Sequence, residues 1–219
     1  MFAQTRMHTE TLKDYFDRLA DCWDERVVHD GSKIRRLFSL FEIPPNARIL
    51  DVGSGTGVLI PIFLKRLGRA GRIIALDFSE RMLQIAREKF GNRGIKYVCE
   101  DVENYEPGEE FDVISCYSCF PHFRKQKRLL MRMAGWLRAE GWLVVMHLQG
   151  RDQINSRHRE ADDAVQKDYL PLAGVVAAWM WEAGLSPVLT VDTQELYFVG
   201  GKKICASVKH FCQSTCIYR

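Results

Sequence analysis

The sequence contains no apolar run that approaches the roughly 20 residues needed for a membrane-spanning helix. Its first residues, MFAQTRMHTETLKDYFDRL, lack the apolar stretch of a secretory signal peptide. Excess charge is also small, because 31 Lys and Arg against 28 Asp and Glu leave a net charge of +3. Such a charge does not by itself indicate nucleic acid or a membrane as a partner. We therefore expect a cytoplasmic protein with no membrane partner.

Cysteine is too thinly scattered along the chain to form a disulfide scaffold. Seven cysteines, an odd number, are scattered through 219 residues, whereas disulfide-stabilised domains are shorter and denser in cysteine. We expect reduced thiols. The sequence also has no internal repeat and no linker rich in Pro, Gly or Ser. A chain of this length is expected to form a single domain, 1–219, with one substantial core.

Short apolar runs and helical segments alternate along most of the chain. The first segment is an amphipathic helix with apolar residues at helical spacing: Leu12, Tyr15, Phe16, Leu19 and Trp23. A second helix is expected over 33–41. Further helices are predicted at 57–67, 79–90, 122–138, 150–168 and 172–183, and strands at 48–52, 72–77, 96–101, 111–116, 142–148, 186–193 and 195–202.

Strands that alternate with helices indicate crossover connections and a parallel sheet. The last two strands are close enough in the sequence to form an antiparallel hairpin. The predicted fold is therefore a doubly wound, Rossmann-like α/β sheet, mostly parallel with an antiparallel terminal strand.

The segment ILDVGSGTGVL, residues 49–59, places three glycines at the first strand-to-helix turn. Glycine permits a tight turn and leaves no Cβ between the backbone and a ligand. Ligands of doubly wound sheets bind at the carboxyl ends of the strands. The dinucleotide fingerprint GxGxxG is not met, because Val58 stands where its third glycine would be. No Gly-Lys-Ser/Thr of a P-loop follows, so the loop does not predict a pyrophosphate ligand.

Acidic residues at the ends of three predicted strands add a second indication. Asp51, Asp77 and Asp101 close the first, second and third strand, so their carboxylates should meet at one edge of the sheet. Asp77 is placed to accept hydrogen bonds from both hydroxyls of a ribose, and Asp101 to accept from an exocyclic amine. The implied ligand has an amine and a ribose but no phosphate.

These motifs resemble those of the class I S-adenosylmethionine-dependent methyltransferases. ILDVGSGTG is similar to the first motif of that family, IIALDFSERML to the second, CEDVENY to the third and EFDVISC to the fourth, and LRAEGWLVVMH resembles the segment of its fifth strand. The resemblance covers about 12–202 and extends to small-molecule methyltransferases, including those of quinone biosynthesis. It implies a seven-stranded methyltransferase fold with a helical cap at 1–45, a Rossmann-like core at 46–203 and a tail at 204–219.

The resemblance also implies S-adenosyl-L-methionine as the cofactor and a set of residues that bind it. Those residues are Asp51, Gly53, Gly55 and Cys116 near the methionine moiety, Asp77 at the ribose, Asp101 and Val102 at the adenine, Tyr15 in the cap, and also Ser54 and Phe78. Phe16 is the alternative to Tyr15. Plainer roles remain open: Asp77 as a helix cap before Ser79, Asp101 as a solvated strand end, and the two aromatic residues as core packing.

The acceptor side is less specified, since methyl transfer from a sulfonium can proceed by alignment alone and needs a base only for some nucleophiles. His147 ends the fifth strand and is the first candidate base or acceptor ligand, followed by His122 after the fourth strand. A polar stripe on the next predicted helix is a further candidate for acceptor binding, with its solvated face as the alternative: Arg151, Asn155, His158 and Asp162.

Metal and nucleic-acid chemistry are both disfavoured by missing motifs. Cys116 and Cys119 have the spacing of half a zinc site, but no second CxxC follows, so no metal is predicted. The pattern Asn/Asp-Pro-Pro-Tyr/Phe of methyltransferases that act on nucleic-acid bases is absent. Basic and aromatic residues do not interleave in a way that indicates base stacking.

The predicted function is methyl transfer from S-adenosylmethionine to a small-molecule acceptor by in-line displacement, in a monomer or homodimer. Three alternatives stay open at this point. They are a non-catalytic module that binds the cofactor, a methyltransferase that acts on RNA or protein, and a nicotinamide-dependent oxidoreductase. The missing third glycine of the fingerprint disfavours the last of these.

Overall fold

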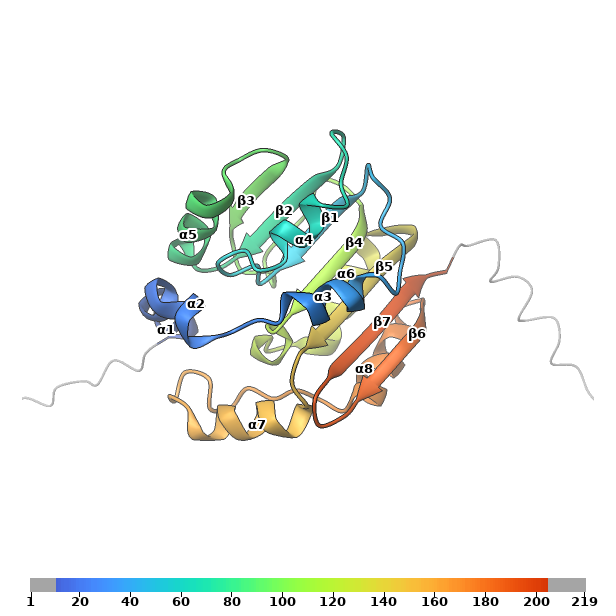
Figure 1. The fold of residues 1–219 in the computed structure, drawn as a ribbon. Helices are drawn as coiled ribbons and strands as arrows, with labels where there is room; N and C mark the ends of the chain where they lie inside the picture. The colour runs from blue at the N-terminus through green and yellow to red at the C-terminus, as the bar shows by residue number, and fades with distance from the viewer. Residues whose placement is uncertain (1–10, 205–219) are drawn as a thin grey trace, which may run out of the picture.

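The computed structural model describes residues 11–204, which surround a seven-stranded sheet of order β3-β2-β1-β4-β5-β7-β6 (Figure 1). The strands are β1 Arg48–Val52, β2 Arg72–Asp77, β3 Ile95–Cys99, β4 Phe111–Tyr117, β5 Leu137–His147, β6 Leu185–Asp192 and β7 Tyr197–Lys203. β1 to β5 are parallel, whereas β7 is antiparallel to both β5 and β6. The predicted doubly wound, mostly parallel sheet with an antiparallel terminal strand is confirmed.

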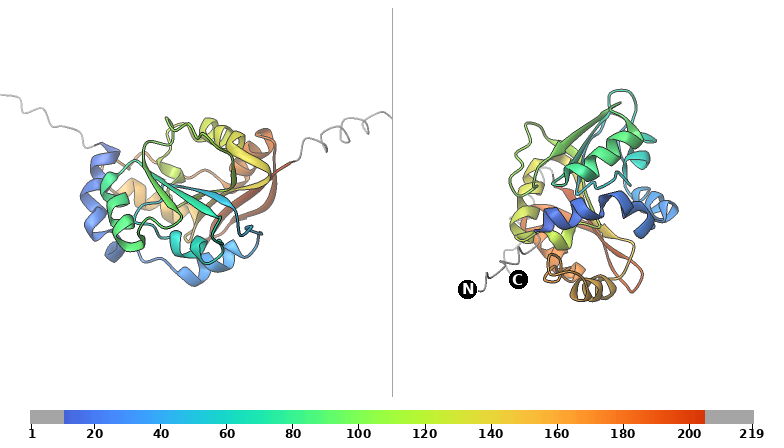
Figure 2. Two further views of the ribbon diagram at one scale, coloured as in Figure 1. Left: turned by 90° about the horizontal axis from the view of Figure 1, so that it is seen from above. Right: turned by 90° about the vertical axis from the view of Figure 1, so that its left-hand side faces the viewer.

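Helices cover both faces of the sheet, as the two additional views show (Figure 2). The helices are α1 Leu12–Leu19, α2 Trp23–Arg26, α3 Gly31–Phe38, α4 Ile60–Leu64, α5 Glu80–Phe90, α6 Gln126–Trp136, α7 Arg151–Glu160 and α8 Ala173–Glu182, with short 3-10 helices η1 Ala20–Cys22 and η2 Phe120–His122. α3, α4 and α5 pack on one face, and α6 and α8 on the other. The chain order reverses between β1 and β4, which places the ligand-binding edge of such a fold there.

Alternation along β1 shows how one strand supports both layers of the core. Leu50 and Val52 pack with Met133 of α6 on one face, whereas Ile49 packs with Phe63 of α4 on the other. All five side chains are almost completely buried. Because both faces are covered, the central strands are apolar throughout, which explains why RILDV and WLVVM carry so few polar residues.

Several predicted boundaries shift, each for a local reason. β3 ends at Cys99 and not at Asp101, because the chain turns there and Asn104 N donates to Asp101 O at 2.8 Å. The helix expected over 150–168 ends at Glu160, since Ala161 adopts an extended backbone. The helix expected over 122–138 begins later, at the start of α6, because a 3-10 turn comes before it.

The N-terminal helices are clamped onto the carboxyl edge of the sheet by acidic side chains. Asp17 of α1 accepts a hydrogen bond from Ser79 Oγ at 2.5 Å. Asp24 of α2 accepts from Thr56 Oγ1 at 2.6 Å and is paired with Lys89. These contacts bring the cap beside α5 and the glycine loop, where Figure 1 shows α1 and α2. The charged residues of the cap therefore face the core domain and not only solvent.

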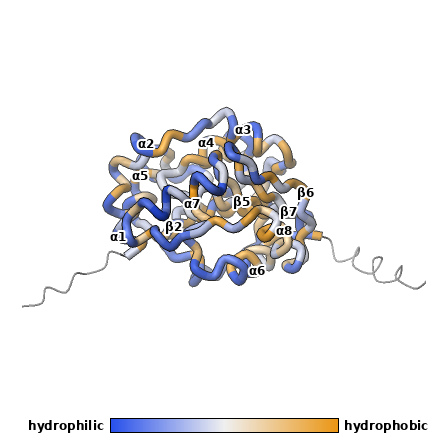
Figure 3. The backbone as a smooth tube through the Cα atoms, turned by 90° about the horizontal axis from the view of Figure 1, so that it is seen from below, coloured by the Kyte–Doolittle hydropathy of each residue, from blue (hydrophilic) through white to orange (hydrophobic). Residues whose placement is uncertain are grey.

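The distribution of hydropathy separates two helices that follow β5 (Figure 3). α7, with the sequence RDQINSRHRE, is among the most hydrophilic segments, whereas α8, with AGVVAAWMWE, is apolar and packs under the sheet. Within residues 11–204, none of the helices combines the length and the apolar character required to cross a membrane.

Candidate functional site

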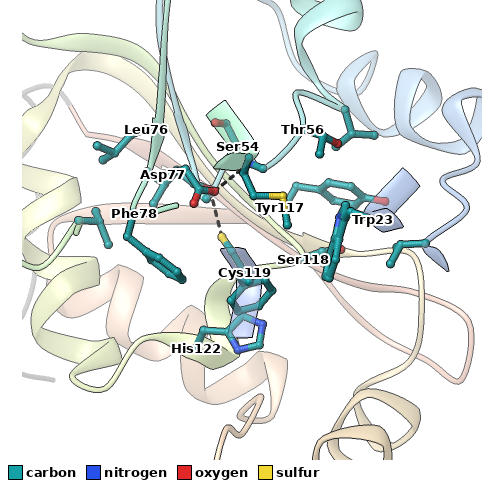
Figure 4. A pocket seen from close by; sticks show the side chains of 18 of the residues that line it. Trp23, Ser54, Thr56, Leu76, Asp77, Phe78, Tyr117, Ser118, Cys119 and His122 are labelled. Carbon is teal, nitrogen blue, oxygen red and sulfur yellow. Dashed lines mark hydrogen bonds between the residues drawn. The ribbon is translucent and has the colours of Figure 1, made fainter. Parts of the chain in front are cut away.

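A cavity of about 790 Å³ opens at the carboxyl ends of β1, β2 and β4, and we call it the first cavity (Figure 4). It is lined by Phe16, Trp23, Val27, His29, Val52, Gly53, Ser54, Gly55, Thr56, Val58, Leu76, Asp77, Phe78, Met82, Glu100, Val102, Tyr117, Ser118, Cys119, His122 and Phe123. The glycine loop, the end of β2 and the turn after β4 thus meet around one space.

The glycines of the loop are required by their own backbone geometry. Gly53, Gly55 and Gly57 have φ angles of +64°, +54° and +88°, in the left-handed region that side chains rarely adopt. A Cβ added to Gly53 would also lie 2.5 Å from the Cβ of Cys119. A Cβ on Gly55 would meet nothing within 4 Å, so that position borders open space. Close approach within the protein therefore explains Gly53, whereas Gly55 faces the cavity.

Asp77 is held at the floor of the first cavity by two backbone donors. Its carboxylate accepts hydrogen bonds from Gly55 N at 2.8 Å and from Ser79 N at 2.9 Å. Burial raises the pKa of Asp77 to about 6, against the lowering effect of these two bonds. Ser79 itself caps α5 by accepting from Met82 N at 3.1 Å. The helix already has its cap, which leaves the carboxylate available to a ligand in the cavity.

Asp51 and Ser54 present polar atoms that the protein itself does not satisfy. Asp51 Oδ1 accepts from Ser115 Oγ at 2.7 Å, but among the described residues Asp51 Oδ2 and Ser54 Oγ have no hydrogen-bond partner. Both residues are buried, and burial raises the pKa of Asp51 to about 7. Unsatisfied buried polar atoms are rare and point to a ligand. A ligand with an ammonium group fits a carboxylate in this state.

Four of the predicted cofactor-binding residues do not line the first cavity: Tyr15, Asp51, Asp101 and Cys116. The exposed side chain of Asp101 accepts from Glu103 N at 2.8 Å, because β3 has ended two residues earlier, and Glu100 lines the cavity in its place. Cys116 is completely buried, with its Sγ 3.8 Å from Met133 Sδ, so it belongs to the core under α6. The structure thus places neither side chain in the lining of the first cavity, and their roles toward the cofactor stay predictions. Phe78 and Val102 do line the cavity.

A second cavity of about 900 Å³ adjoins the first. It is lined by Tyr15, Phe16, Trp23, Val27, Val28, His29, Tyr117, Ser118, Pro121, His122, His147, Leu148, Gln149, Ile154, Arg157, His158, Ala161 and Val165. The cap contributes Tyr15 to this cavity and not to the first one, where Phe16 takes the predicted place. The two cavities share a wall that includes Trp23, Tyr117 and His122.

His147 lines the second cavity but is a poor base. It is 4% exposed, and burial lowers its pKa to about 3, with nearby His122 and His158 adding to the effect. Among the described residues its Nε2 has no hydrogen-bond partner. A neutral imidazole with such weak basicity can donate or accept a hydrogen bond, but it does not hold a proton near neutral pH. Of its two predicted roles, the structure therefore favours acceptor ligand over base.

The polar stripe predicted on the helix after β5 does not act as one surface. Arg151 pairs with Asp192, 3.4 Å from Nε to Oδ2. Asn155 is buried and bonds the backbone of Leu170, and Asp162 lies beyond the end of α7. Of the four residues only His158 lines the second cavity. The other three residues are engaged elsewhere or lie beyond the helix, which the helical spacing in the sequence does not reveal.

The sequence reasoning missed residues that the fold brings to the site. Ser118 lines both cavities with a φ of 55°, an unusual backbone for a serine, and its N–H donates to Met146 O at 3.0 Å. Cys119 lines the first cavity and donates to Val52 O at 3.1 Å. Asp168, in the loop after α7, forms a hydrogen bond with His122 through its carboxylate. CYSC drew attention to Cys119, but no pattern marks Ser118 or Asp168.

Metal ligation has no support in residues 11–204, where no group of His, Cys, Asp and Glu is arranged to hold an ion. Cys205, Cys212 and Cys216 of the tail lie outside the described residues. A doubly wound sheet with a glycine loop, a buried carboxylate at the end of β2 and a cavity at its switch point is the arrangement in which Rossmann-like proteins bind nucleosides.

Comparison with known proteins narrows this class. Residues 49–141 match the family described as Methyltransferase domain. The chain is 28% identical over 135 residues to the malonyl-[acyl-carrier protein] O-methyltransferase of Acetivibrio thermocellus, covering 61% of this chain and 47% of that protein. It is 32% identical over 123 residues to the ubiquinone/menaquinone biosynthesis C-methyltransferase UbiE of Vibrio parahaemolyticus, covering 52% and 48%. The chain thus spans about half the length of these relatives.

Solved structures share the fold of this chain. The magnesium protoporphyrin IX methyltransferase of Synechocystis with bound SAH has a TM-score of 0.66 at 15% identity, covering 88% of this chain and 98% of that one. A SAM-dependent methyltransferase of Aquifex aeolicus has a TM-score of 0.63 at 18% identity, with the same coverage. The family match over residues 49–141 and the shared fold support a class I S-adenosylmethionine-dependent methyltransferase domain, with S-adenosylmethionine as its cofactor.

Proposed function

We propose that the protein transfers a methyl group from S-adenosylmethionine to a small-molecule acceptor. The observation that carries this proposal is the pair of adjoining cavities with a common wall. The first cavity has residues that suit the cofactor, and the second offers an adjoining space with a mixed polar and apolar lining. Two substrates bound in adjoining cavities that share lining residues can meet the need of a group transfer for proximity and alignment.

The residues present fit the cofactor. Asp51 and Ser54 supply unsatisfied polar atoms for the methionine end, and Asp77 supplies a carboxylate for the ribose hydroxyls. Phe78 and Val102 supply apolar surface for the adenine. The bound cofactor supplies a sulfonium methyl group that a nucleophile takes by in-line displacement. The protein's own task is then to orient the acceptor and to exclude water.

The atom that receives the methyl group is not determined by the relatives. One relative is named for an O-methyltransferase activity and the other for a C-methyltransferase activity. The aromatic and apolar residues in part of the lining of the second cavity favour a compact molecule with a flat body over a polymer. Trp23, Ile154 and Val165 are among these residues.

Calorimetric titration with S-adenosylmethionine and S-adenosylhomocysteine tests the cofactor half of the proposal, with NADH as a comparison ligand. We expect both adenosyl ligands to bind and NADH not to bind. Asp77→Ala should weaken binding on the order of 100-fold, because it removes a buried charged acceptor. The matched control is Asp101→Ala, an exposed carboxylate outside the first cavity, which should bind like the wild type.

The acceptor half is tested by incubating the protein with labelled cofactor and a panel of small aromatic and aliphatic acceptors, RNA and protein. Transfer to a small molecule supports the proposal. Cofactor binding without transfer to any acceptor would indicate a binding module, and transfer to RNA or protein alone would contradict the small-molecule assignment. Equal affinity in Asp77→Ala and wild type would overturn the placement of the cofactor.

A further inference from the structure

One histidine stands in the wall between the two cavities. His122 ends the 3-10 turn η2 after β4 and lines both cavities. Its ring is held by aromatic neighbours on two sides, with centroid distances of 5.1 Å to Phe16 of the cap and 5.2 Å to His158 of α7. A side chain that borders both spaces is positioned to act on a group that passes between them.

A carboxylate fixes the orientation of this ring. His122 Nδ1 lies 2.5 Å from Asp168 Oδ2, and the two side chains are only 13% and 18% exposed. A carboxylate accepts hydrogen bonds, so Nδ1 carries the proton in this contact. In the neutral ring Nε2 then keeps its lone pair and is the basic atom. The contact therefore selects the tautomer that a general base needs.

The loop that carries Asp168 is tied to the core on both sides of that residue. The backbone oxygen of Asp168 accepts from His158 Nδ1 at 3.2 Å. Tyr169 O accepts from Gln126 Nε2 at 2.8 Å. Leu170 exchanges two hydrogen bonds with buried Asn155, at 3.0 and 2.8 Å. Contacts of this kind hold the carboxylate in place before any substrate arrives.

The other histidines that line the second cavity are less suited to the role. Burial lowers the pKa of His147 to about 3. Burial also lowers the pKa of His158, whose Nδ1 is engaged with a carbonyl oxygen. His29 is bonded to Tyr117 Oη at 2.7 Å, and burial lowers its pKa as well. Among the described histidines, only His122 is paired with a carboxylate.

Resting on the function proposed above, we propose that the acceptor is a phenol and that His122 Nε2 takes the proton of its hydroxyl group. In this scheme Asp168 is a positioning residue. The aromatic walls of the second cavity suit a flat ring, and a phenolic hydroxyl, with a pKa of about 10, must lose its proton to become a good nucleophile. An aliphatic hydroxyl is a far weaker acid, and an already ionised acceptor needs no base.

The balance of the step is complete with these components. The O–H proton moves to His122 Nε2 while the oxygen forms a bond to the methyl carbon and the carbon–sulfur bond breaks. The sulfur retains that electron pair and leaves as a neutral thioether. The charge that the sulfonium loses is thus carried by the imidazolium, which Asp168 stabilises, and the proton passes afterwards to solvent.

The first test is a nitrogen-15 NMR spectrum of the histidine rings in the protein without cofactor. We expect His122 to be in the Nδ1–H tautomer in the wild type, and this preference to be lost in Asp168→Asn. Asp163→Asn, a change of an exposed acid in the same loop, is the matched control and should leave the ring signals unchanged. An Nε2–H tautomer in the wild type would overturn the proposal, whatever the activity.

The second test compares transfer rates for a series of phenols of increasing acidity. His122→Gln should lower kcat about 100-fold or more for weakly acidic phenols, and the loss should shrink towards none for phenols that are already ionised at the assay pH. Asp168→Asn should lower kcat in the same pattern with little change in KM. Loss that is equal for all phenols, or no transfer to any phenol, overturns the proposal.

The outcomes for the two proposals are distinguishable. If S-adenosylmethionine does not bind to the wild type, the proposed function fails, and the tautomer measurement still reports on the dyad of His122 and Asp168. If the cofactor binds and methyl groups are transferred with full rate in His122→Gln, the proposed function stands and the inference about the base fails.

Discussion

The two cavities share a wall, yet they are built in different ways. Much of the lining of the first cavity comes from two short runs, 52–58 and 76–78. Within it, backbone N–H groups hold the Asp77 carboxylate in place. The second cavity collects side chains from the cap, the turn after β4, the end of β5, α7 and the loop that follows α7. His122 and Asp168, which meet at 2.5 Å, are 46 positions apart in the sequence.

This difference separates what is common to a family from what is particular to one member. A loop made of glycines and backbone donors binds the parts of the cofactor that never change, so a short motif is sufficient to encode it. A cavity formed by side chains from distant segments can change shape with few substitutions. We therefore expect substitutions in the glycine loop to damage the whole protein and substitutions around the second cavity to act locally.

The largest effect is expected for Gly53→Ala. The new Cβ would lie 2.5 Å from Cys119 Cβ, on a backbone with a φ of +64°. Left-handed strain and overpacking together should lower the free energy of unfolding by about 2–5 kcal/mol and abolish cofactor binding. Gly55→Ala is the control, because its φ is +54° but its Cβ meets nothing within 4 Å. Chemical denaturation of both variants measures the difference, and equal losses would show that the contact with Cys119 is unimportant.

A second effect on the side of the first cavity depends on pH. The pKa of Asp51 is raised to about 7 by burial, so the folded protein binds a proton that the unfolded chain releases above about pH 4. Its contribution to stability is present below pH 4 and is lost as the pH rises through 7. Relative to Asp51→Asn, the cofactor-free wild type should lose on the order of 2–4 kcal/mol between pH 4 and 7.5. If the difference in the free energy of unfolding between wild type and Asp51→Asn is the same across this range, the pKa of Asp51 is not raised by burial.

On the side of the second cavity, His147 should show the opposite dependence on pH. Its folded pKa of about 3 lies below that of the unfolded chain, so its contribution is present above about pH 6.5 and is lost as the pH falls towards 3. His147→Gln should therefore gain about 2 kcal/mol relative to the wild type between pH 7.5 and pH 5. Thermal denaturation at both pH values measures this gain, and its absence would mean that water reaches the ring.

The smallest effect is expected for the ion pair that joins the cap to the loop after α7. Arg18 Nη2 lies 2.9 Å from Asp162 Oδ2, with both side chains about half exposed, 51% and 57%. Arg18→Ala should lower the free energy of unfolding by less than about 1 kcal/mol, and added salt should reduce that loss. Denaturation at low and high salt is the measurement. A larger loss that is insensitive to salt would show that the cap is held mainly by this contact.

Much of the fold could be predicted because its signals are local. The apolar runs of β1 and β2 coincide with the predicted 48–52 and 72–77, and the glycine loop follows directly. The site was less predictable than the fold, because a small shift in where a strand ends changes the direction of the side chains that follow it. Asp101 was expected at a strand end, but β3 stops at Cys99 and the carboxylate turns to the backbone of Glu103.

The sequence by itself determined the class of fold, the glycine loop and the carboxylate of Asp77, because each depends on residues that are neighbours in the chain. Only the tertiary structure decided that Phe16 reaches the first cavity, that Cys116 is buried under α6, and that Asp168 lies against His122. The physical reason is that hydrophobic periodicity specifies which face of an element is buried. It does not specify which distant side chain meets that face, and this depends on how the packed layers bring separate segments together.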